Sequence, residues 1–567
     1  MVAYTSRGRS LAAAAQRPTV SHRVHSFTTL LSLLVVVTAL ALLAGRIKVP
    51  HPLLLVLAGL ALALLPLPTR PTLRPELVFG LFLPPLLYQS AWLSSWHEFR
   101  ARMRPIALMA VLLVLATIGA VACAAHVLLG LPWAVAFVLG AIVSPTDSVA
   151  PVSVVRRLGA SRQLVTVLEG ESLLNDATGL VAWRLAVAAV ATGSFSWVHA
   201  GGSFVVGAAG GVAVGLAVGW IAARVHRRLD EPSIETTLTL LTPYMAWLAA
   251  EALELSGVLA VVSAGLYVSR QSSRAFAARL RLQAVPVWRT LGFLLESLLF
   301  ILLGLELREV LGSVGQQRAW GPLLGAVVLL GLLVTAVRLL WIFPQAWLPR
   351  RLSARLRERD PMPPWRELVV LGWMGMRGAV SMAAALSLPL TTASGAPFPE
   401  RERLLFLSYG VVLWTLLVQG LTLPGLIRWL GLHDDGLARR EEVTARVAAA
   451  DAALARIDAL LAEGGEPQSE LLLAMRTRQE SRLRGLRRHL AAGKARPQEV
   501  EGGRLLSEGQ QRLVEQVLEA QRQALLELRQ EGAIHDEVLH RLERELDLEE
   551  ERLHLAASLG GEGAHLV

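Results

Sequence analysis

The chain contains 567 residues, of which 53% are hydrophobic and only 18% are charged, with a formal net charge of +10. Soluble domains carry about 25% charged residues, so this composition predicts a polytopic membrane protein and disfavours an array of soluble domains. The basic residues are scattered over short loops between apolar segments, which is the pattern of the positive-inside rule and does not indicate nucleic-acid binding. The single Cys123 excludes an intramolecular disulfide framework.

Residues 1–26 are expected to form a polar N-terminal tail, which an apolar segment follows at 27–44. Basic residues ahead of a short apolar run also occur in secretory signal peptides, so a cleaved signal is the alternative. A first transmembrane helix is the simpler interpretation, because no soluble domain follows this segment.

The apolar pattern over residues 27–430 predicts a transmembrane domain. A spanning helix needs about 20 apolar residues, and shorter ones are tolerated within a bundle. We predict thirteen spans, at 27–44, 52–66, 75–93, 105–130, 132–155, 163–192, 201–223, 235–253, 257–270, 285–306, 320–347, 366–389 and 403–430.

The basic residues also predict the orientation of these spans. If the C-terminus is cytoplasmic, thirteen spans place the N-terminus outside, and the inner loops then carry about 20 basic residues against about 6 in the outer loops. The arginines of the N-terminal tail are the discordant feature. The expected location is the inner membrane of a bacterial cell.

Residues 431–567 differ in character, because they are polar, charged and rich in Ala, Leu, Glu and Arg. Helical periodicity is visible in LLSEGQQRLVEQVLEAQRQALLELRQ and in HRLERELDLEEERLHLA. Breaks between helices are expected near 464–467 and 493–498, where Gly and Pro occur. This region is predicted to be a cytoplasmic helical tail, with coiled-coil character, that regulates the protein or contacts a subunit.

The segment EGESLLNDATGL (169–180) places three carboxylates at the start of a predicted span. Carboxylates in the hydrocarbon region are costly and are usually functional. On a helix, Glu169, Ser172 and Asp176 share one face, and Glu171 and Asn175 form the adjacent stripe. These oxygens suit a hard alkali cation, and a carboxylate also suits a proton. The alternative is an ion pair with a buried Arg that serves packing only, which is more attractive for Glu171 than for Asp176.

The preceding span contains SPTDSVAP, in which Pro145 and Pro151 bracket Thr146 and Asp147. A continuous helix would lose backbone hydrogen bonds there. Carbonyl groups freed at membrane depth are tolerated only inside a protein or beside a water cavity. Thr146 and Asp147 are therefore candidates for the site, and a simple proline kink is the alternative.

A second interruption is predicted in LGWMGMRGAVSMAAALSLP (371–389), where glycines surround Arg377. The permanent positive charge of this side chain requires a buried anion. The two interruptions fall at the fifth span of two six-span halves, and paired interruptions at matching positions indicate an inverted-repeat transporter.

Other charged residues in the predicted spans are accessory candidates. Glu296 lies in the middle of its span and could partner an Arg or tune a response to pH. Arg184 lies two turns beyond Asp176 on much the same helix face, and a structural counter-ion and a functional group are equally good interpretations.

Five motifs in this order resemble NhaP-type bacterial cation–proton antiporters and the related eukaryotic sodium–proton exchangers. They are PPLLYQSAW, SPTDSVAPVSVVRRLGA, EGESLLNDATGLVAWR, ESLLFILLGLEL and GMRGAVSMAAALSLP. The resemblance covers about residues 27–430. It implies an all-α fold of two inverted repeats, a moving core with two discontinuous crossed helices, and a homodimer.

The resemblance also implies roles for individual residues. Asp176 matches the ion-binding carboxylate, Ser172 a hydroxyl ligand of the monovalent cation, and Thr146 a ligand through its backbone carbonyl. Asp147 and Asn175 match neighbours that shape the site. Glu171 and Arg377 match a structural ion pair of the family. Where some relatives carry an acidic residue, this chain has Gln89, which leaves the affinity and the preference among sodium, potassium and lithium open.

The function implied is electroneutral exchange of one monovalent cation for one proton, with both competing for Asp176 and no cofactor. A potassium–proton antiporter, a channel and a non-transporting sensor on the same fold remain alternatives. An intramembrane hydrolase is disfavoured, because Ser-containing spans lack a positioned His and HExxH is absent.

Overall fold

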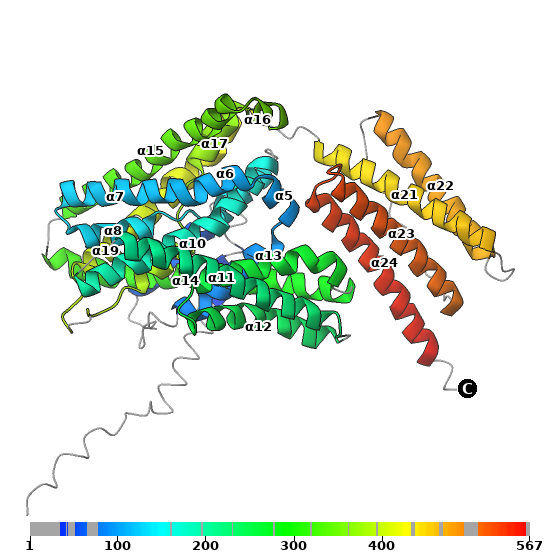
Figure 1. Cartoon of the computed structure of the whole chain (residues 1–567), viewed down its shortest axis with the longest axis horizontal. Coiled ribbons are helices and arrows are strands. Elements are labelled where there is room, and N and C mark those ends of the chain that lie inside the picture. Colours follow the sequence, from blue (N-terminus) through cyan, green and yellow to red (C-terminus); the bar gives the residue numbers. More distant parts are fainter. Residues whose placement is uncertain are drawn as a thin grey trace, which may run out of the picture.

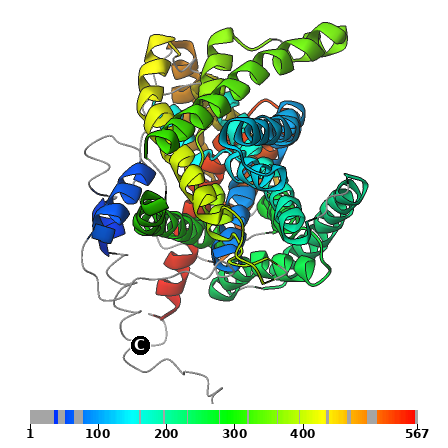
Figure 2. The ribbon, with the colours of Figure 1, turned by 90° about the vertical axis from the view of Figure 1, so that its left-hand side faces the viewer.

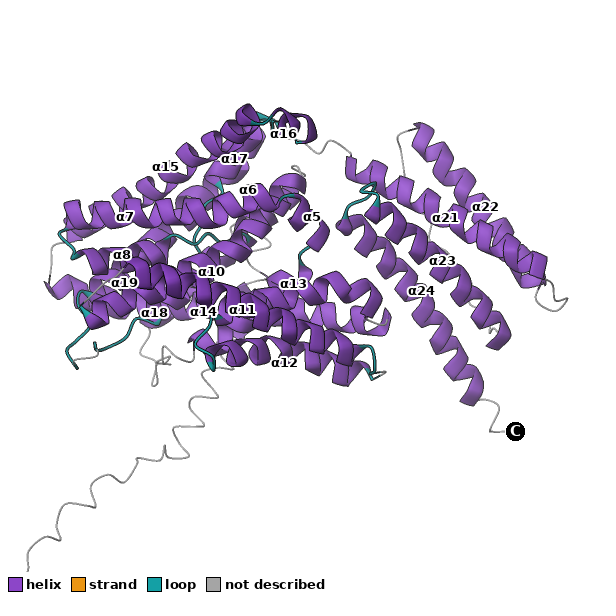
Figure 3. Cartoon of the chain, in the orientation of Figure 1, coloured by secondary structure: helices purple, strands orange, loops and turns teal. Residues whose placement is uncertain are grey.

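The computed structural model describes residues 35–40, 42, 51–64, 78–158, 162–193, 197–229, 231–275, 278–317, 320–360, 362–392, 395–432, 437–463, 469–492 and 508–562. The regular secondary structure of the described residues is helical, apart from an isolated bridge between Thr391 and Pro397, and loops join the helices (Figure 3). This confirms the predicted all-α class. The N-terminal tail (1–26), most of the segment 27–44 and the predicted breaks of the C-terminal tail lie outside the described residues.

The first half of the transmembrane region contains the helices that lead to the candidate site. They are α2 (His51–Leu64), η1 (Val78–Phe82), α4 (Leu83–Leu93), α5 (Trp96–Ala101), α6 (Met103–Ala107), η2 (Leu108–Leu113), α7 (Val114–Leu129), α8 (Trp133–Val143), α9 (Val149–Leu158), α10 (Arg162–Thr192), α11 (Trp197–His226) and α12 (Pro232–Glu251). The η segments are π-helical, and η2 joins α6 and α7 into one continuous span.

The second half contains α13 (Gly257–Ala275), α14 (Ala278–Gln317), α15 (Trp320–Leu352), α16 (Ala354–Arg359), α17 (Trp365–Trp373), α18 (Ala379–Leu386), α19 (Arg401–Trp414), η3 (Thr415–Gln419) and α20 (Gly420–Trp429). The helix α14 packs closely against α2 (Figure 2). This approach depends on glycines, since a Cβ atom on Gly304 would lie 2.2 Å from the carbonyl oxygen of Val56.

Six helices of the described chain are long and apolar enough to cross a membrane: Met103–Leu129, Gln163–Thr192, Phe204–His226, Leu280–Glu306, Trp320–Leu352 and Arg401–Trp429. Two shorter apolar helices are His51–Leu64 and Trp133–Val143. Each of the six long helices coincides with a predicted span. The total of thirteen spans and the inverted repeats stay predictions.

Both predicted helix interruptions are present. The first interrupted span consists of α8 and α9, which residues 144–148 separate. The second consists of α17 and α18, which residues 374–378 separate. The single apolar cluster of the transmembrane region includes residues from both pairs of half-helices. The interruptions therefore lie inside the bundle, where freed backbone groups can find protein partners.

The tail forms four helices, α21 (Leu437–Glu463), α22 (Ser469–Ala492), α23 (Glu508–Gln530) and α24 (Asp536–Glu562), which lie together beside the transmembrane helices (Figure 1). Leucines, valines and alanines of these helices form two small apolar cores. The helix α24 contacts the transmembrane part, because Arg281 of α14 donates hydrogen bonds to both carboxylate oxygens of Asp547, at 2.9 and 2.5 Å.

Candidate ion-binding site

The polar stripe of α10 is buried inside the bundle. Glu171 and Asn175 are each 1% exposed and Asp176 is 8% exposed, while Ser172, one turn before Asp176, is half-buried. The helix continues unbroken through this stripe, so its backbone groups are satisfied within α10 and the side chains alone are available for other partners.

Thr146 connects the first interruption to α10. Its hydroxyl donates to Oε1 of Glu171 at 3.0 Å and accepts a hydrogen bond from Nδ2 of Asn175 at 2.7 Å. The same Asn175 amide donates to the Thr146 carbonyl at 3.3 Å. Oδ1 of Asn175 is buried and has no hydrogen-bond partner among the described residues. An acceptor oxygen is thus held at the interruption without a protein donor.

Asp147 is placed where the two interruptions meet. Its backbone N–H donates to the carbonyl of Met376 at 2.7 Å, and its Oδ1 accepts from the N–H of Val149 at 2.9 Å. The carboxylate lies against Gly378, where an added Cβ atom would come within 2.0 Å of Oδ2. Only glycine at 378 leaves room for this carboxylate.

Arg377 satisfies carbonyl groups that the interruptions free. Its Nε donates to the carbonyl of Val143 at 2.8 Å, at the end of α8, and its Nη1 donates to the carbonyl of Gly375. Its backbone N–H donates to the hydroxyl of Thr415 at 3.1 Å. The side chain is 1% exposed, so these acceptors replace water as its hydrogen-bond partners.

The expected partner of Glu171, Arg377, is near enough for their opposite charges to interact but forms no direct hydrogen bond or ion pair with it in the described chain. Glu171 pairs instead with Arg338 of α15, whose Nη1 donates to Oε1 and whose Nη2 donates to Oε2 at 2.7 Å. Arg338 also donates from Nε to the carbonyl of Leu371 at 3.2 Å. The planar guanidinium fits the carboxylate with two parallel hydrogen bonds, and the buried charge of each group is compensated by the other.

Arg338 is the important residue that the sequence interpretation missed. A signal was present, since this arginine is the one charge in the apolar run GLLVTAVRLLWIF (331–343). An ionisable residue within a span is a candidate for a functional or structural partner by itself. The glycine-rich surroundings of Arg377 drew attention to the other arginine.

Near the place where the two interruptions meet, three carboxylates have no direct cationic partner among the described residues. Asp147 is close enough to interact electrostatically with Asp176 and with Glu296. Within the described part of the chain, Asp176 and Ser172 form no hydrogen bond or ion pair with another side chain. A monovalent cation or a proton would neutralise the charge that the protein leaves uncompensated here. Asp176, Ser172, Asp147 and Asn175 carry oxygen atoms of the kind that bind a hard monovalent cation.

Comparison with known proteins identifies the group to which these features belong. The sequence model of the protein family described as the transmembrane sodium/hydrogen exchanger matches residues 31–429. The chain belongs to the sodium/hydrogen exchanger family. This confirms the resemblance drawn from the five motifs, and the exchanger is a transporter rather than an enzyme.

The exchanger is similar to several curated relatives. It is 35% identical over 536 residues to an uncharacterized Na(+)/H(+) exchanger of Mycobacterium tuberculosis, a match that covers 94% of this chain and 96% of the relative. It is 36% identical over 388 residues to the sodium, potassium, lithium and rubidium/H(+) antiporter of Bacillus pumilus, covering 66% of this chain and 57% of that protein.

The fold of the exchanger also matches a solved structure. The sodium proton antiporter MjNhaP1 from Methanocaldococcus jannaschii superimposes with a TM-score of 0.56 at 19% sequence identity, and the match covers 70% of this chain and 99% of that chain. This likeness shows the shared all-helical fold.

The four accessory candidates differ in their partners. Gln89 of α4 packs on Gly292 of α14, where a Cβ atom would meet its Oε1 at 1.6 Å. One turn further along α14, Oε1 of Glu296 is buried without a partner among the described residues. Glu169 and Arg184 lie outside this group, because Glu169 pairs with Arg156 at 2.8 Å and Arg184 pairs with Glu251 at 2.5 Å.

Proposed function

We propose that the protein exchanges one monovalent cation for one proton across the membrane, with Asp176 binding each in turn. The observation that carries this proposal is the buried Asp176 carboxylate, which lies beside the crossed interruptions and has no cationic side-chain partner in the described chain. Glu171 differs because Arg338 already compensates its charge. We take Asp176 as the one carboxylate that exchanges its ligand, with Asp147 and Glu296 keeping the same protonation state throughout. This gives electroneutral 1:1 antiport, in which the cation-bound and the protonated forms of Asp176 cross and the bare carboxylate does not.

Sodium is the first candidate for the cation, and potassium and lithium are the alternatives. The names of the relatives support this set, since one acts on sodium, potassium, lithium and rubidium. Gln89 supplies an uncharged oxygen on the α4 side, so the cation is held with one formal charge fewer than a carboxylate there would give. The physiological role that follows is control of cytoplasmic pH and sodium.

The deciding experiment measures proton flux in proteoliposomes that contain a pH-sensitive dye. Addition of sodium, potassium, lithium or rubidium should evoke proton movement that Asp176→Asn abolishes. Glu169→Gln is the matched control, because it removes a carboxylate of the same helix that is partly exposed and already paired with Arg156. Retained flux in Asp176→Asn would contradict the assignment. A rate that changes with an imposed membrane potential would contradict electroneutral exchange, and uncoupled, voltage-dependent flux would support a channel.

We further propose that the protein is a homodimer of the inner membrane with a cytoplasmic tail. The tail contacts Ser95 and Glu98, which precede Arg100, Arg102 and Arg104, on the side that carries the arginine-rich loops. The helix α11 presents an apolar surface to its surroundings, since only 17% of its most apolar 18-residue stretch is buried inside the protein. This surface suits either lipid or a second copy, and cross-linking of paired cysteines introduced into α11 distinguishes the two.

A further inference from the structure

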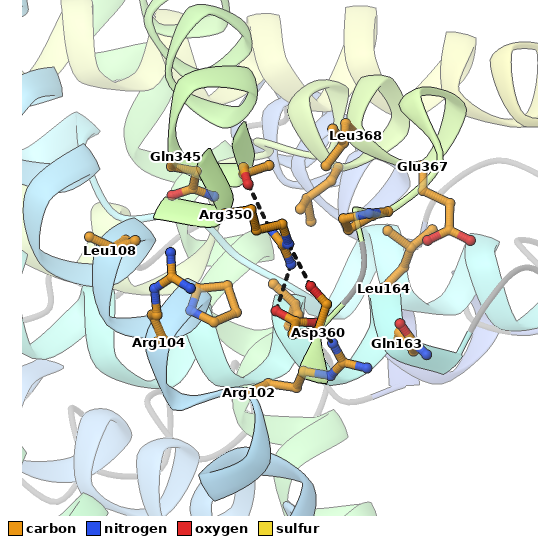
Figure 4. A pocket seen from close by; sticks show the side chains of 15 residues that line it. Arg102, Arg104, Leu108, Gln163, Leu164, Gln345, Arg350, Asp360, Glu367 and Leu368 are labelled. Carbon is orange, nitrogen blue, oxygen red and sulfur yellow. Dashed lines mark hydrogen bonds and ion pairs between the residues drawn. The ribbon is translucent and has the colours of Figure 1, made fainter. Parts of the chain in front are cut away.

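A separate pocket, with apolar walls and several charged side chains, opens between α6, α10, α15 and α17, away from the two interruptions (Figure 4). It encloses about 70 Å³. Its polar lining residues include Arg104 of α6 and Arg102 just before it, Gln345 and Arg350 of α15, and Asp360 before α17. The pocket lies at the arginine-rich ends of these helices, where the polar headgroup region of a membrane would be.

The arginines of the pocket exceed the acceptors that the protein offers them. Asp360 accepts hydrogen bonds from both Arg102, at 3.0 Å, and Arg350, at 2.6 Å. Arg350 also donates to the carbonyls of Asp360 and Ala346, at 2.9 and 2.6 Å. A guanidinium group has five N–H donors, so Arg102 and Arg350 both retain donors after these bonds.

Arg104 has no side-chain hydrogen bond or ion pair with a described residue, although it is near enough to Arg350 and to Asp360 for their charges to interact with its own. Three guanidinium groups therefore face a pocket whose acidic lining residues are Asp360 and Glu367, of which Glu367 has another interaction. Three arginines against two carboxylates leave one excess positive charge, which disfavours a cation and favours a compact anion. Phosphate is the anion whose several oxygens match the forked geometry of arginine.

We propose that this pocket binds a phosphate group, from the headgroup of an anionic phospholipid or from a soluble phosphate. Basic pockets between transmembrane helices bind lipid headgroups in this way. Arg104 would form the most new hydrogen bonds with a bound phosphate, because its side-chain N–H donors have no partner among the described residues. Leu108, Leu164 and Leu368 supply apolar walls beside the arginines and suit the glycerol and first methylene groups of a lipid.

The pocket is joined to the ion site through its inner wall. Leu371 lines the pocket, and its carbonyl accepts a hydrogen bond from the same Arg338 that holds Glu171. An occupant would therefore contact α17 and α10 at once, the two helices that carry the second interruption and Asp176.

Binding is tested with the full chain in detergent and without an ion gradient, so the result does not depend on transport. Thermal unfolding is followed at constant ionic strength while inorganic phosphate, dioctanoyl phosphatidylglycerol or dioctanoyl phosphatidylcholine is added. The phosphatidylcholine has the same chains and phosphate but a neutral headgroup overall. Arg104→Gln should weaken binding of the active probe by at least about tenfold, the loss expected for a charged hydrogen bond.

Arg351→Gln is the matched control, since this arginine lies at the same end of α15 but stacks over Trp347, at 4.7 Å from the ring centroid, and does not line the pocket. Saturable stabilisation by inorganic phosphate supports the proposal and identifies a soluble ligand. Stabilisation by phosphatidylglycerol alone supports it and identifies a lipid. No saturable effect of either probe, or equal losses in the Arg104 and Arg351 variants, overturns it.

Discussion

Glu171 of α10 and Arg338 of α15 form a bidentate ion pair in which both residues are 1% exposed. The carboxylate also accepts a hydrogen bond from Thr146, so this one group joins α10, α15 and the first interruption. The energetic consequence is asymmetric, because loss of either charge leaves the other buried without compensation.

Removal of one member of this pair should destabilise the protein strongly. We expect Arg338→Gln to lower the free energy of unfolding by about 3–5 kcal/mol, because Glu171 keeps a buried charge. Thermal or denaturant unfolding of the detergent-purified chain measures this. The double variant Glu171→Gln/Arg338→Gln should recover part of the loss. As a control, Arg184→Gln breaks a pair whose side chains are 40% and 37% exposed, and should cost about 1 kcal/mol or less.

The space at Gly378 should be required for the position of Asp147. An alanine at this position would place its Cβ atom 2.0 Å from Oδ2 of Asp147, so the carboxylate or the backbone must move. We expect Gly378→Ala to lower stability by about 1–3 kcal/mol and to reduce cation-evoked proton flux. Gly119→Ala is the control, since no atom lies within 4 Å of its added Cβ. Equal activity of the two variants would argue against the close packing at Asp147.

The hydroxyl of Thr146 should matter more than its methyl group. Thr146→Val removes a donor to Glu171 and an acceptor for Asn175, and unsatisfied buried groups cost about 1–3 kcal/mol. Thr146→Ser keeps the hydroxyl and should retain most of the stability and flux. Proteoliposome assays and thermal unfolding of both variants provide the comparison. A loss of equal size in the serine variant would assign the effect to packing instead.

The C-terminal tail should become less stable as pH rises. Desolvation opposes the charged imidazole of His540, but its hydrogen bond to Glu543 at 3.2 Å and the charges of Glu543 and Asp536 outweigh this and the repulsion from Arg529, so the pKa of His540 is raised from 6.5. Stabilisation from a raised pKa is complete below about pH 6.5 and is lost as pH rises through the raised value. Because 52% of the side chain is exposed, solvent screens the pair and the effect is small.

Limited proteolysis of the tail between pH 5.5 and 8.5 measures this effect. Cleavage of the wild type should be faster at the higher pH, and both His540→Gln and Glu543→Gln should reduce the difference. A difference of unchanged size in both variants would place the titrating group elsewhere.

The sequence predicted the all-helical membrane fold and both helix interruptions because hydropathy and helix breakers act locally. The apolar runs located the long spans, and the prolines and glycines around Thr146 and Arg377 located both interruptions. The helical spacing placed Glu171, Asn175 and Asp176 on neighbouring stripes of one helix, and the structure gives α10 that form.

The partner of Glu171 could not be read from spacing, because it depends on how α15 packs against α10. Two buried arginines were available in sequence, and only the three-dimensional arrangement directs Arg338 to the carboxylate and Arg377 to backbone carbonyls. The contacts of the tail were also beyond the sequence, since Ser95 and Asp536 are 441 positions apart.

Among the described residues, α24 forms hydrogen bonds with the transmembrane part at two places. At its start, Asp536 accepts a hydrogen bond from Ser95, and its N–H donates to Glu98, which also accepts from Thr166 of α10 at 2.6 Å. Eleven residues later, Asp547 is held by Arg281 of α14. A helix rises about 1.5 Å per residue, so the two attachments are about 16 Å apart along a stiff rod. The helix α24 therefore limits the separation of α10, which it reaches through Glu98, from α14 at this end of the bundle. A sliding movement between them that exceeds the slack of a hydrogen bond, about 1 Å, must either turn the whole tail or detach one of its ends.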